Sequence, residues 1–329
     1  MFEGKKVLVT GGAGFLGCNL VEHLLEKGAL VIVLDNLFRG RLTNLQASLD
    51  NPNLTFIEGD VCLESDLLKC ESVHSSLDII FHLAAINGTK WFHEKARDVI
   101  ETNIVGTLRT LESAQRSNAR YVLASSPEAF GESKQQPLSD GNPMVFSNPA
   151  IHQRHSYGAS KYLDEVATQH AIRDGLDARI VRPFNAYGPK LLGDEYGQVV
   201  AIFFQSIIDH EPITLHGDGS QTRSFTWIDD VTEGFIKAAS NKAQSGDVYN
   251  IGSQQEVSIA QLQKMIFSIV SEDVNWFGGL PAVTIGEGYH GDSVRRLPDI
   301  VNNQKIDWKA KVSLNQGLQQ MWDSIKTTD

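Results

Sequence analysis

The chain has few cysteines, no long apolar run and no excess of positive charge. Its three cysteines, Cys18, Cys62 and Cys70, are an odd number without CxxC spacing. This pattern argues against a disulfide framework and against a zinc site built on cysteines. The apolar window 201–208 is interrupted by polar residues and is too short to cross a bilayer. Since the first ten residues lead directly into a strand pattern, we expect no signal peptide, no membrane partner and a cytoplasmic protein.

Positive side chains are outnumbered. The chain has 29 lysines and arginines against 40 aspartates and glutamates, a formal net charge of −11. This balance argues against a nucleic-acid backbone as the partner. An anionic small molecule is compatible with it if helix N-termini and a few arginines create a local positive potential.

The first half of the chain alternates short apolar runs with amphipathic helical patterns. Near-continuous apolar strands between helices are typical of a parallel sheet covered on both faces, so we predict a doubly wound α/β domain. The rhythm changes after residue 183, where turn-rich segments separate shorter helical patterns. We therefore predict a first domain at 1–183 and a smaller lobe mainly at 184–329. Part of the chain after residue 183 can return to the first domain. The expected strands are Lys6–Thr10, Leu30–Asp35, Leu54–Glu58, Asp78–Leu83, Tyr121–Ser125 and Ala178–Arg182.

A glycine-rich segment, GGAGFLG at residues 11–17, follows the first strand and opens a helical pattern. Glycines in this context let backbone N–H groups approach a pyrophosphate at a helix N-terminus. Asp35 ends the second strand, where a carboxylate accepts hydrogen bonds from ribose hydroxyls and repels a 2′-phosphate. The segment therefore predicts NAD rather than NADP, although Arg39 lies nearby. The alternative is a glycine turn that only packs a helix on a strand.

Tyr157 and Lys161 stand four residues apart in the segment YGASK, at the start of a helical pattern. This spacing places them on one helix face. A lysine ammonium and the positive ring of bound NAD would lower the pKa of the phenol and make it a general base for a sugar hydroxyl. An ordinary exposed Tyr/Lys pair is the alternative.

Polar residues also follow the fifth predicted strand. Ser126 and Glu128 come after it, and the carboxyl ends of parallel strands are where ligands bind in open α/β sheets. We expect Ser126 to hydrogen-bond the reacting hydroxyl and Glu128 to serve as a second base. A turn serine and a solvated loop acid are the alternatives.

With these motifs in place, the chain resembles the extended short-chain dehydrogenase/reductase family, in its nucleotide-sugar epimerase/dehydratase branch. The resemblance covers nearly the whole chain, through GGAGFLG, HLAA at 82–85, YGASK, RPFNAYGP at 182–189, GDGSQTRSF at 217–225 and RRLPDI at 295–300. It implies a Rossmann-type domain with a smaller C-terminal substrate-binding lobe, and a homodimer formed through helices at 95–117 and 155–172. It also implies Tyr157 as base, Lys161 as its activator and cofactor anchor, and Ser126 as the hydroxyl partner.

The loop pattern and the resemblance together give a set of residues that contact NAD. They are Gly11, Gly14, Phe15, Leu16, Gly17, Asp35, Asn36, Asp60, Val61, Leu83, Ala84, Ala85, Asn103, Tyr157 and Lys161.

The resemblance also gives contacts to a nucleotide-sugar, with a UDP-sugar favoured. Asn185, Arg223 and Arg296 match positions that hold the diphosphate, and Arg295 is an alternative to Arg296. Guanidinium groups suit phosphate oxygens because they bind them bidentately. Val199 and Leu215 would flank the base and nucleoside. Lys90 either reaches a substrate carboxylate or phosphate or is simply a loop lysine.

Members of this branch oxidise the sugar at C4 and differ in the fate of the resulting ketone. Pro127 stands where dTDP-glucose dehydratases have an acid, so that subtype is disfavoured. The segments 217–225 and 295–300 look closest to UDP-glucuronate decarboxylases, whereas RPFNAYGP is shared with many epimerases. We favour a UDP-sugar 4-epimerase, with UDP-glucuronate decarboxylase second and a 4,6-dehydratase third.

Two further possibilities are weighed. A non-catalytic NAD-binding regulatory protein could have the same fold, although it would not need an activated phenol. His152 and His155 are spaced i, i+3 but have no third ligand in the sequence pattern, so we predict no metal.

Overall fold

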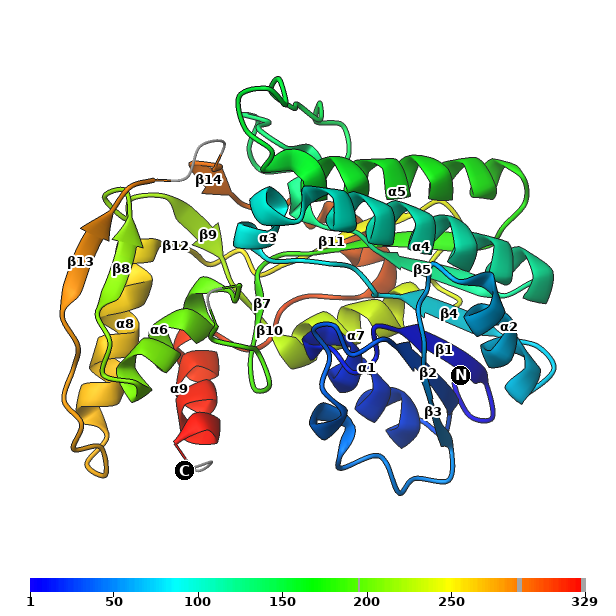
Figure 1. The fold of residues 1–329 in the computed structure, drawn as a ribbon, viewed down its shortest axis with the longest axis horizontal. Coiled ribbons are helices and arrows are strands. Elements are labelled where there is room, and N and C mark those ends of the chain that lie inside the picture. Colours follow the sequence, from blue (N-terminus) through cyan, green and yellow to red (C-terminus); the bar gives the residue numbers. More distant parts are fainter. Residues whose placement is uncertain (195, 289–291, 327–329) are drawn as a thin grey trace.

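A seven-stranded parallel sheet forms the centre of the first lobe in a computed structural model of the chain, which describes residues 1–194, 196–288 and 292–326 (Figure 1). The strand order is β11-β6-β5-β4-β1-β2-β3. The predicted α/β class is confirmed. The strands are β1 (Lys6–Thr10), β2 (Leu30–Asp35), β3 (Leu54–Glu58), β4 (Ile79–His82), β5 (Arg120–Ala124), β6 (Ala178–Pro183) and β11 (Val248–Ile251).

Alternating side chains of the strands build two separate cores. In β1, Val7 and Val9 join the core under α1 (Phe15–Glu26) and α7 (Ile228–Ala238). Leu8, one residue between them, joins the core on the opposite face. There the sheet is covered by α2 (Glu64–Val73), α4 (Ala96–Ser117) and α5 (His155–Arg173). Strands buried on both faces explain why the apolar runs are continuous rather than alternating.

The second lobe packs three helices against short strands (Figure 1). Its helices are α6 (Val199–Ile208), α8 (Ile259–Glu272) and α9 (Leu314–Ile325). Its strands form a parallel pair, β8 (Ile213–His216) with β13 (Val283–Gly286), and a three-stranded sheet of β12 (Glu256–Ser258), β9 (Thr222–Ser224) and β14 (Arg295–Arg296).

The chain crosses between the lobes more than once. The short pair β7 (Ala186–Tyr187) and β10 (Thr226–Trp227) leads into α7, and α7 and β11 both pack into the first lobe although they follow residue 183. The remaining elements are α3 (Thr89–Glu94) and the 3-10 turns η1 (Leu42–Leu45), η2 (Pro127–Phe130) and η3 (Val301–Ile306). Among the described residues, none of the helices combines the length and the apolar character needed to span a membrane.

Leu8→Ala tests the two-core arrangement, because Leu8 is fully buried in the central strand. We expect the free energy of unfolding to fall by about 2 to 5 kcal/mol, the cost of lost apolar contacts and a residual cavity. Leu68→Ala, at an exposed position of α2, is the control and should change it by about 0.5 kcal/mol or less. Urea denaturation followed by circular dichroism measures both, and equal effects would contradict the packing described.

Candidate active site

One cavity of about 440 Å³ lies at the carboxyl ends of the strands and is lined by residues from both lobes. The parallel register sets Thr10 of β1 beside Leu34 of β2 and His82 of β4, so the loops that follow these strands meet at one edge. Segments of the second lobe line the same cavity through Asn185 and Val199. The arrangement therefore places a loop-built dinucleotide region and a second-lobe region in one continuous space.

The glycine loop has the geometry of a phosphate site. Gly11 has φ +69°, and a Cβ there would lie 2.8 Å from the Cα of Ala84, so a side chain would be excluded. Gly14 is the N-cap of α1 and contributes no side-chain cap, which leaves the first N–H groups of the helix available. These N–H groups and the helix dipole suit a pyrophosphate.

Asp35 is buried at the end of β2, and its carboxylate accepts hydrogen bonds from the N–H groups of Ala13 (2.9 Å) and Leu37 (2.8 Å). Burial raises the pKa of Asp35, and the two backbone hydrogen bonds work in the opposite direction. Arg39 lines the cavity, but its guanidinium is engaged elsewhere, 3.2 Å from the carboxylate of Asp194. The anion at this position therefore suits ribose hydroxyls better than a 2′-phosphate.

Thirteen of the fifteen residues predicted to contact NAD line the cavity, and Asp60 and Asn103 do not. Asp60 accepts a hydrogen bond from the N–H of Cys62, as a turn residue does. Asn103 is fully buried, accepts from the N–H of Ile86 and donates to Ser160. It ties the segment after β4 to α5, so it supports the cavity wall from behind.

Tyr157, Lys161 and Ser126 converge on the cavity from α5 and the end of β5. Lys161 is almost fully buried and donates to the carbonyl of Ala124 and to Asp164, both at 3.1 Å. Its Nζ lies 6.0 Å from the centre of the Tyr157 ring. A fixed ammonium beside a phenol is the arrangement that the sequence pattern predicts.

The protein groups alone do not activate the phenol. Burial raises the pKa of Tyr157 well above its usual value, the charges of Glu128 and Asp164 raise it further, and a hydrogen bond from Ser126 lowers it. Lys161 does not offset these effects, and its ammonium is itself paired with Asp164 at 3.1 Å. The positive charge of an oxidised nicotinamide is the contribution that would favour the phenolate.

Glu128 is held by Arg296 in a bidentate ion pair of 2.6 and 2.9 Å. Burial alone would raise the pKa of Glu128, but Arg296 and Arg154 outweigh it and hold that pKa at about 2. The carboxylate is therefore ionised at neutral pH. As an anion it can accept a proton or hydrogen bonds but cannot protonate a leaving group.

Arg154 lines the same wall and was missed by the sequence analysis. It is 5% exposed, and its Nη2 lies 2.8 Å from Asp292 and 3.7 Å from Glu128. Its Nε and Nη1 have no hydrogen-bond partner among the described residues. Its position three residues before Tyr157 was the available signal, because the first turn of that helix faces the site.

The other predicted substrate residues divide into two groups. Asn185, Val199, Arg223 and Arg296 line the cavity, whereas Lys90 and Leu215 do not. Lys90 pairs with Glu94 and lies over the ring of Tyr196, and Leu215 is buried in the second lobe.

The structure also separates the two adjacent arginines. Arg296 enters the cavity, whereas Arg295 faces outward and pairs with Glu256 at 2.7 Å. Of the two, Arg296 is therefore the residue placed to contact a ligand.

Comparison with known proteins agrees with this geometry. Residues 7–252 match the model of the NAD dependent epimerase/dehydratase family. UDP-glucuronic acid decarboxylase 2 of Arabidopsis thaliana is 35% identical over 96% of this chain and 67% of its own length. UDP-N-acetyl-alpha-D-glucosaminuronate decarboxylase of Bacillus cytotoxicus is 31% identical over 96% of both. The structure of a UDP-glucose 4-epimerase of Thermotoga maritima with UDP-glucose matches with a TM-score of 0.84, 29% identity and coverage of 98% of this chain and 99% of that one.

The Glu128–Arg296 pair can be tested through the pH dependence of stability. Since the pKa of Glu128 lies near 2 when folded and near 4.5 when unfolded, its ionised form stabilises the fold above pH 4.5 and loses that effect as the pH falls toward 2. We expect the difference in unfolding free energy between wild type and Glu128→Gln to be constant above about pH 5 and to shrink below it. Urea denaturation between pH 7 and 3 measures this difference. A difference that stays flat down to pH 3 would contradict the buried pair.

Proposed function

The chain belongs to the NAD dependent epimerase/dehydratase family, and we propose that it decarboxylates a UDP-uronate, a UDP-sugar with a carboxylate on C5. It is an NAD-dependent enzyme that modifies a nucleotide-sugar. Decarboxylation thus moves ahead of the 4-epimerase favoured from the sequence. The observation that carries the proposal is a cluster of three buried arginines that line the same cavity as Tyr157.

This arginine cluster consists of Arg154, Arg223 and Arg296, and the carboxylates that face it are Glu128 and Asp292. Three cations against two anions leave one uncompensated positive charge among these five described residues. Burial, with the neighbouring guanidinium groups, lowers the pKa of Arg223 to about 10, which reflects the cost of crowding cations. A nucleotide-sugar whose sugar carries its own negative charge would relieve that cost more than one whose hexose is uncharged.

Arg154 distinguishes a uronate from a neutral sugar in this proposal. Its guanidinium lines the cavity, and its Nε and Nη1 have no hydrogen-bond partner among the described residues, so we assign it to the sugar carboxylate. It begins the turn that carries Tyr157, so a group held by Arg154 lies close to the phenol. Arg223 and Asn185 enter the cavity from the second lobe, and we assign them to the diphosphate. A carboxylate contact at Arg154 agrees with the similarity of the chain to uronate decarboxylases.

The proposed chemistry assigns one task to each group. NAD, when bound, accepts a hydride from sugar C4 and later returns it. Tyr157 takes the proton of the C4 hydroxyl, and Ser126 keeps that oxygen oriented. A ketone at C4 makes the C5 carboxylate a β-keto acid, which loses carbon dioxide readily. Tyr157 and Ser126 then hydrogen-bond the enolate oxygen at C4, and a proton from water replaces the lost carbon dioxide at C5. Tyr157 returns its proton to the C4 oxygen when the hydride is returned to C4.

A 4-epimerase is the second candidate, and Pro127 favours it. Pro127 lines the cavity between Ser126 and Glu128, and its side chain has no hydroxyl or acid. An epimerase needs no such group, because its reaction consists only of forming the ketone and reducing it again. The 4,6-dehydratase is less well supported, since Glu128 is held ionised by Arg296 and elimination of a hydroxyl needs an acid. A non-catalytic regulator would have no use for the Tyr157, Lys161 and Ser126 arrangement.

The decisive measurement is mass spectrometry of the products formed from UDP-glucuronate and from UDP-glucose. We expect UDP-glucuronate to lose carbon dioxide and UDP-glucose to remain unchanged.

Tyr157→Phe should keep its NAD but lose about 10²- to 10⁴-fold in turnover, the usual contribution of a general base. Arg154→Met should raise KM for UDP-glucuronate by about tenfold or more, since it removes the proposed carboxylate contact. Conversion of UDP-glucose to its 4-epimer, with UDP-glucuronate untouched, would replace this proposal by the epimerase.

We also propose that the chain forms a homodimer through α4 and α5, which pack side by side on one face of the first lobe (Figure 1). Their outer faces expose large apolar side chains, an arrangement that marks interaction surfaces when the side chains are contiguous. These side chains are Ile100, Leu108, Tyr162, Leu163 and Val166. A cytoplasmic location stays a prediction from the sequence.

Leu163→Glu tests the dimer. Burial of an unpaired carboxylate under a second copy of the chain would disfavour the dimer. We therefore expect the mass measured by sedimentation to fall from twice 36.3 kDa to 36.3 kDa. Leu68→Glu, at an exposed position of α2, is the matched control and should sediment like wild type. A wild-type chain that sediments as a monomer at micromolar concentration would refute the proposal.

A further inference from the structure

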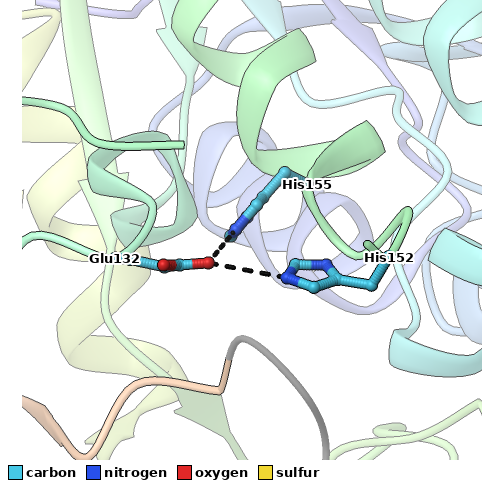
Figure 2. Close-up of side chains that lie close together, drawn as sticks. All are labelled: Glu132, His152 and His155. Atoms are coloured by element: carbon cyan, nitrogen blue, oxygen red, sulfur yellow. Dashed lines mark hydrogen bonds and ion pairs between the residues drawn. The ribbon is translucent and has the colours of Figure 1, made fainter. Parts of the chain in front are cut away.

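Glu132, His152 and His155 come together outside the active-site cavity (Figure 2). Glu132 follows η2, His152 lies in the loop before α5, and His155 is the first residue of α5. The sequence pattern supplied only the two histidines, and folding of the loop 131–154 brings the carboxylate to them. None of the three lines the cavity, so the cluster is separate from the catalytic residues.

The three side chains present their ligand atoms to one point. Oε1 of Glu132 lies 2.8 Å from Nε2 of His155 and 3.6 Å from Nε2 of His152 (Figure 2). All three ligand atoms lie within 4.8 Å of one another. Ligands bound tetrahedrally at Zn²⁺ are about 3.3 Å apart, which falls between the two measured distances. Small side-chain rotations would therefore accommodate an ion.

Hydrogen bonds within the protein do not satisfy this cluster completely. Nε2 of His155 donates to Glu132, and Nε2 of His152 lies 3.0 Å from the hydroxyl of Ser147. The Nδ1 atoms of both imidazoles are buried and have no partner among the described residues. An ion held by the two Nε2 atoms would leave these Nδ1 atoms as they are, so it is the convergence of the three ligand atoms that points to an ion.

We propose that Glu132, His152 and His155 bind a divalent transition-metal ion of the Zn²⁺ class. Two imidazoles and one carboxylate suit Zn²⁺, Co²⁺ or Ni²⁺, whereas Mg²⁺ and Ca²⁺ prefer oxygen ligands alone. The histidine side chains are about one tenth exposed and that of Glu132 is one third exposed. An ion thus has an entry path along the carboxylate, and water can complete its coordination.

The bound ion would fix the loop 131–154 to the start of α5. Backbone hydrogen bonds join this loop to η2, among them the N–H of Val145 donating to the carbonyl of Phe130, and the N–H of Glu132 donates to the carbonyl of Val145 within the loop. Arg154 and Tyr157 stand on either side of His155, so the ion would hold in place the turn that carries both. Its role is structural, because none of its three ligands lines the cavity.

Zinc titration of the NAD-loaded protein, freed of metal with a chelator, tests the site. We expect one equivalent of Zn²⁺ per chain, measured by competition with a chromophoric chelator, and a higher melting temperature. His152→Gln and Glu132→Gln should each weaken this binding by at least about tenfold, as loss of one of three ligands requires. His170→Gln is the matched control, because His170 is exposed at the far end of α5 and pairs with Asp174.

Substitution by Co²⁺ in the wild-type protein gives a second readout that needs no variant. We expect visible absorption of a four- or five-coordinate ion at one equivalent. No saturable binding by the wild type would overturn the proposal. Equal affinity in wild type, His152→Gln and Glu132→Gln would overturn it as well, since any bound zinc would then lie elsewhere. Neither result would bear on the sugar chemistry, which the product analysis tests separately.

Discussion

The parallel register of the central sheet is the constraint on which the site depends. Because all seven strands of the sheet pair in parallel, each delivers its carboxyl end to the same edge. The glycine loop, Asp35 and Ser126 span more than a hundred residues of the chain, yet each lies at or just after the end of a strand and therefore reaches that edge. Burial of the sheet on both faces fixes this register, since a slip by one residue would exchange the side chains of the two cores.

The electrostatics of the site contrast with those of the whole chain. The protein has a net charge of −11 but gathers three arginines in one wall of the cavity. Each guanidinium is nearly buried, so the fold must supply carboxylates to hold them in the absence of substrate anions. Glu128 and Asp292 do so, and Asp292 is shared between Arg154 and Arg223. A bound diphosphate or carboxylate would compete for the same donors, which links substrate binding to rearrangement of these pairs.

The sequence predicted the sheet and most of the cavity because both rest on local patterns. Six central strands were placed within one residue of their observed ends, since each is a short apolar run bounded by turn residues. The seventh, β11, was missed: its four residues include Tyr249 and Asn250, and no helix pattern separates it from the turns around it. Its place beside β6 is set by tertiary pairing over more than sixty residues, which periodicity does not reveal.

The misplaced site residues and the missed ones have different physical causes. Asp60 and Leu215 belong to motifs that do reach the cavity, but neighbours in those motifs, such as Val61 and Thr214, carry the lining side chains. In extended segments, adjacent side chains point to opposite sides, so an error of one residue reverses the assignment. Arg154 and Asp292 were missed because only the fold brings them together, across 138 residues.

A cofactor that gives a hydride to the sugar and takes it back has no need to exchange between turnovers. Aromatic and ionic contacts lie beside the dinucleotide part of the cavity. Phe38 and Tyr196 line the cavity, and the buried ring of Trp91 packs against both, with ring centres 4.4 and 4.7 Å away. Arg39, beside Phe38, pairs with Asp194 at 3.2 Å. These contacts join the loop after β2 to the segment that carries Tyr196, an arrangement compatible with a cofactor that stays bound from one turnover to the next.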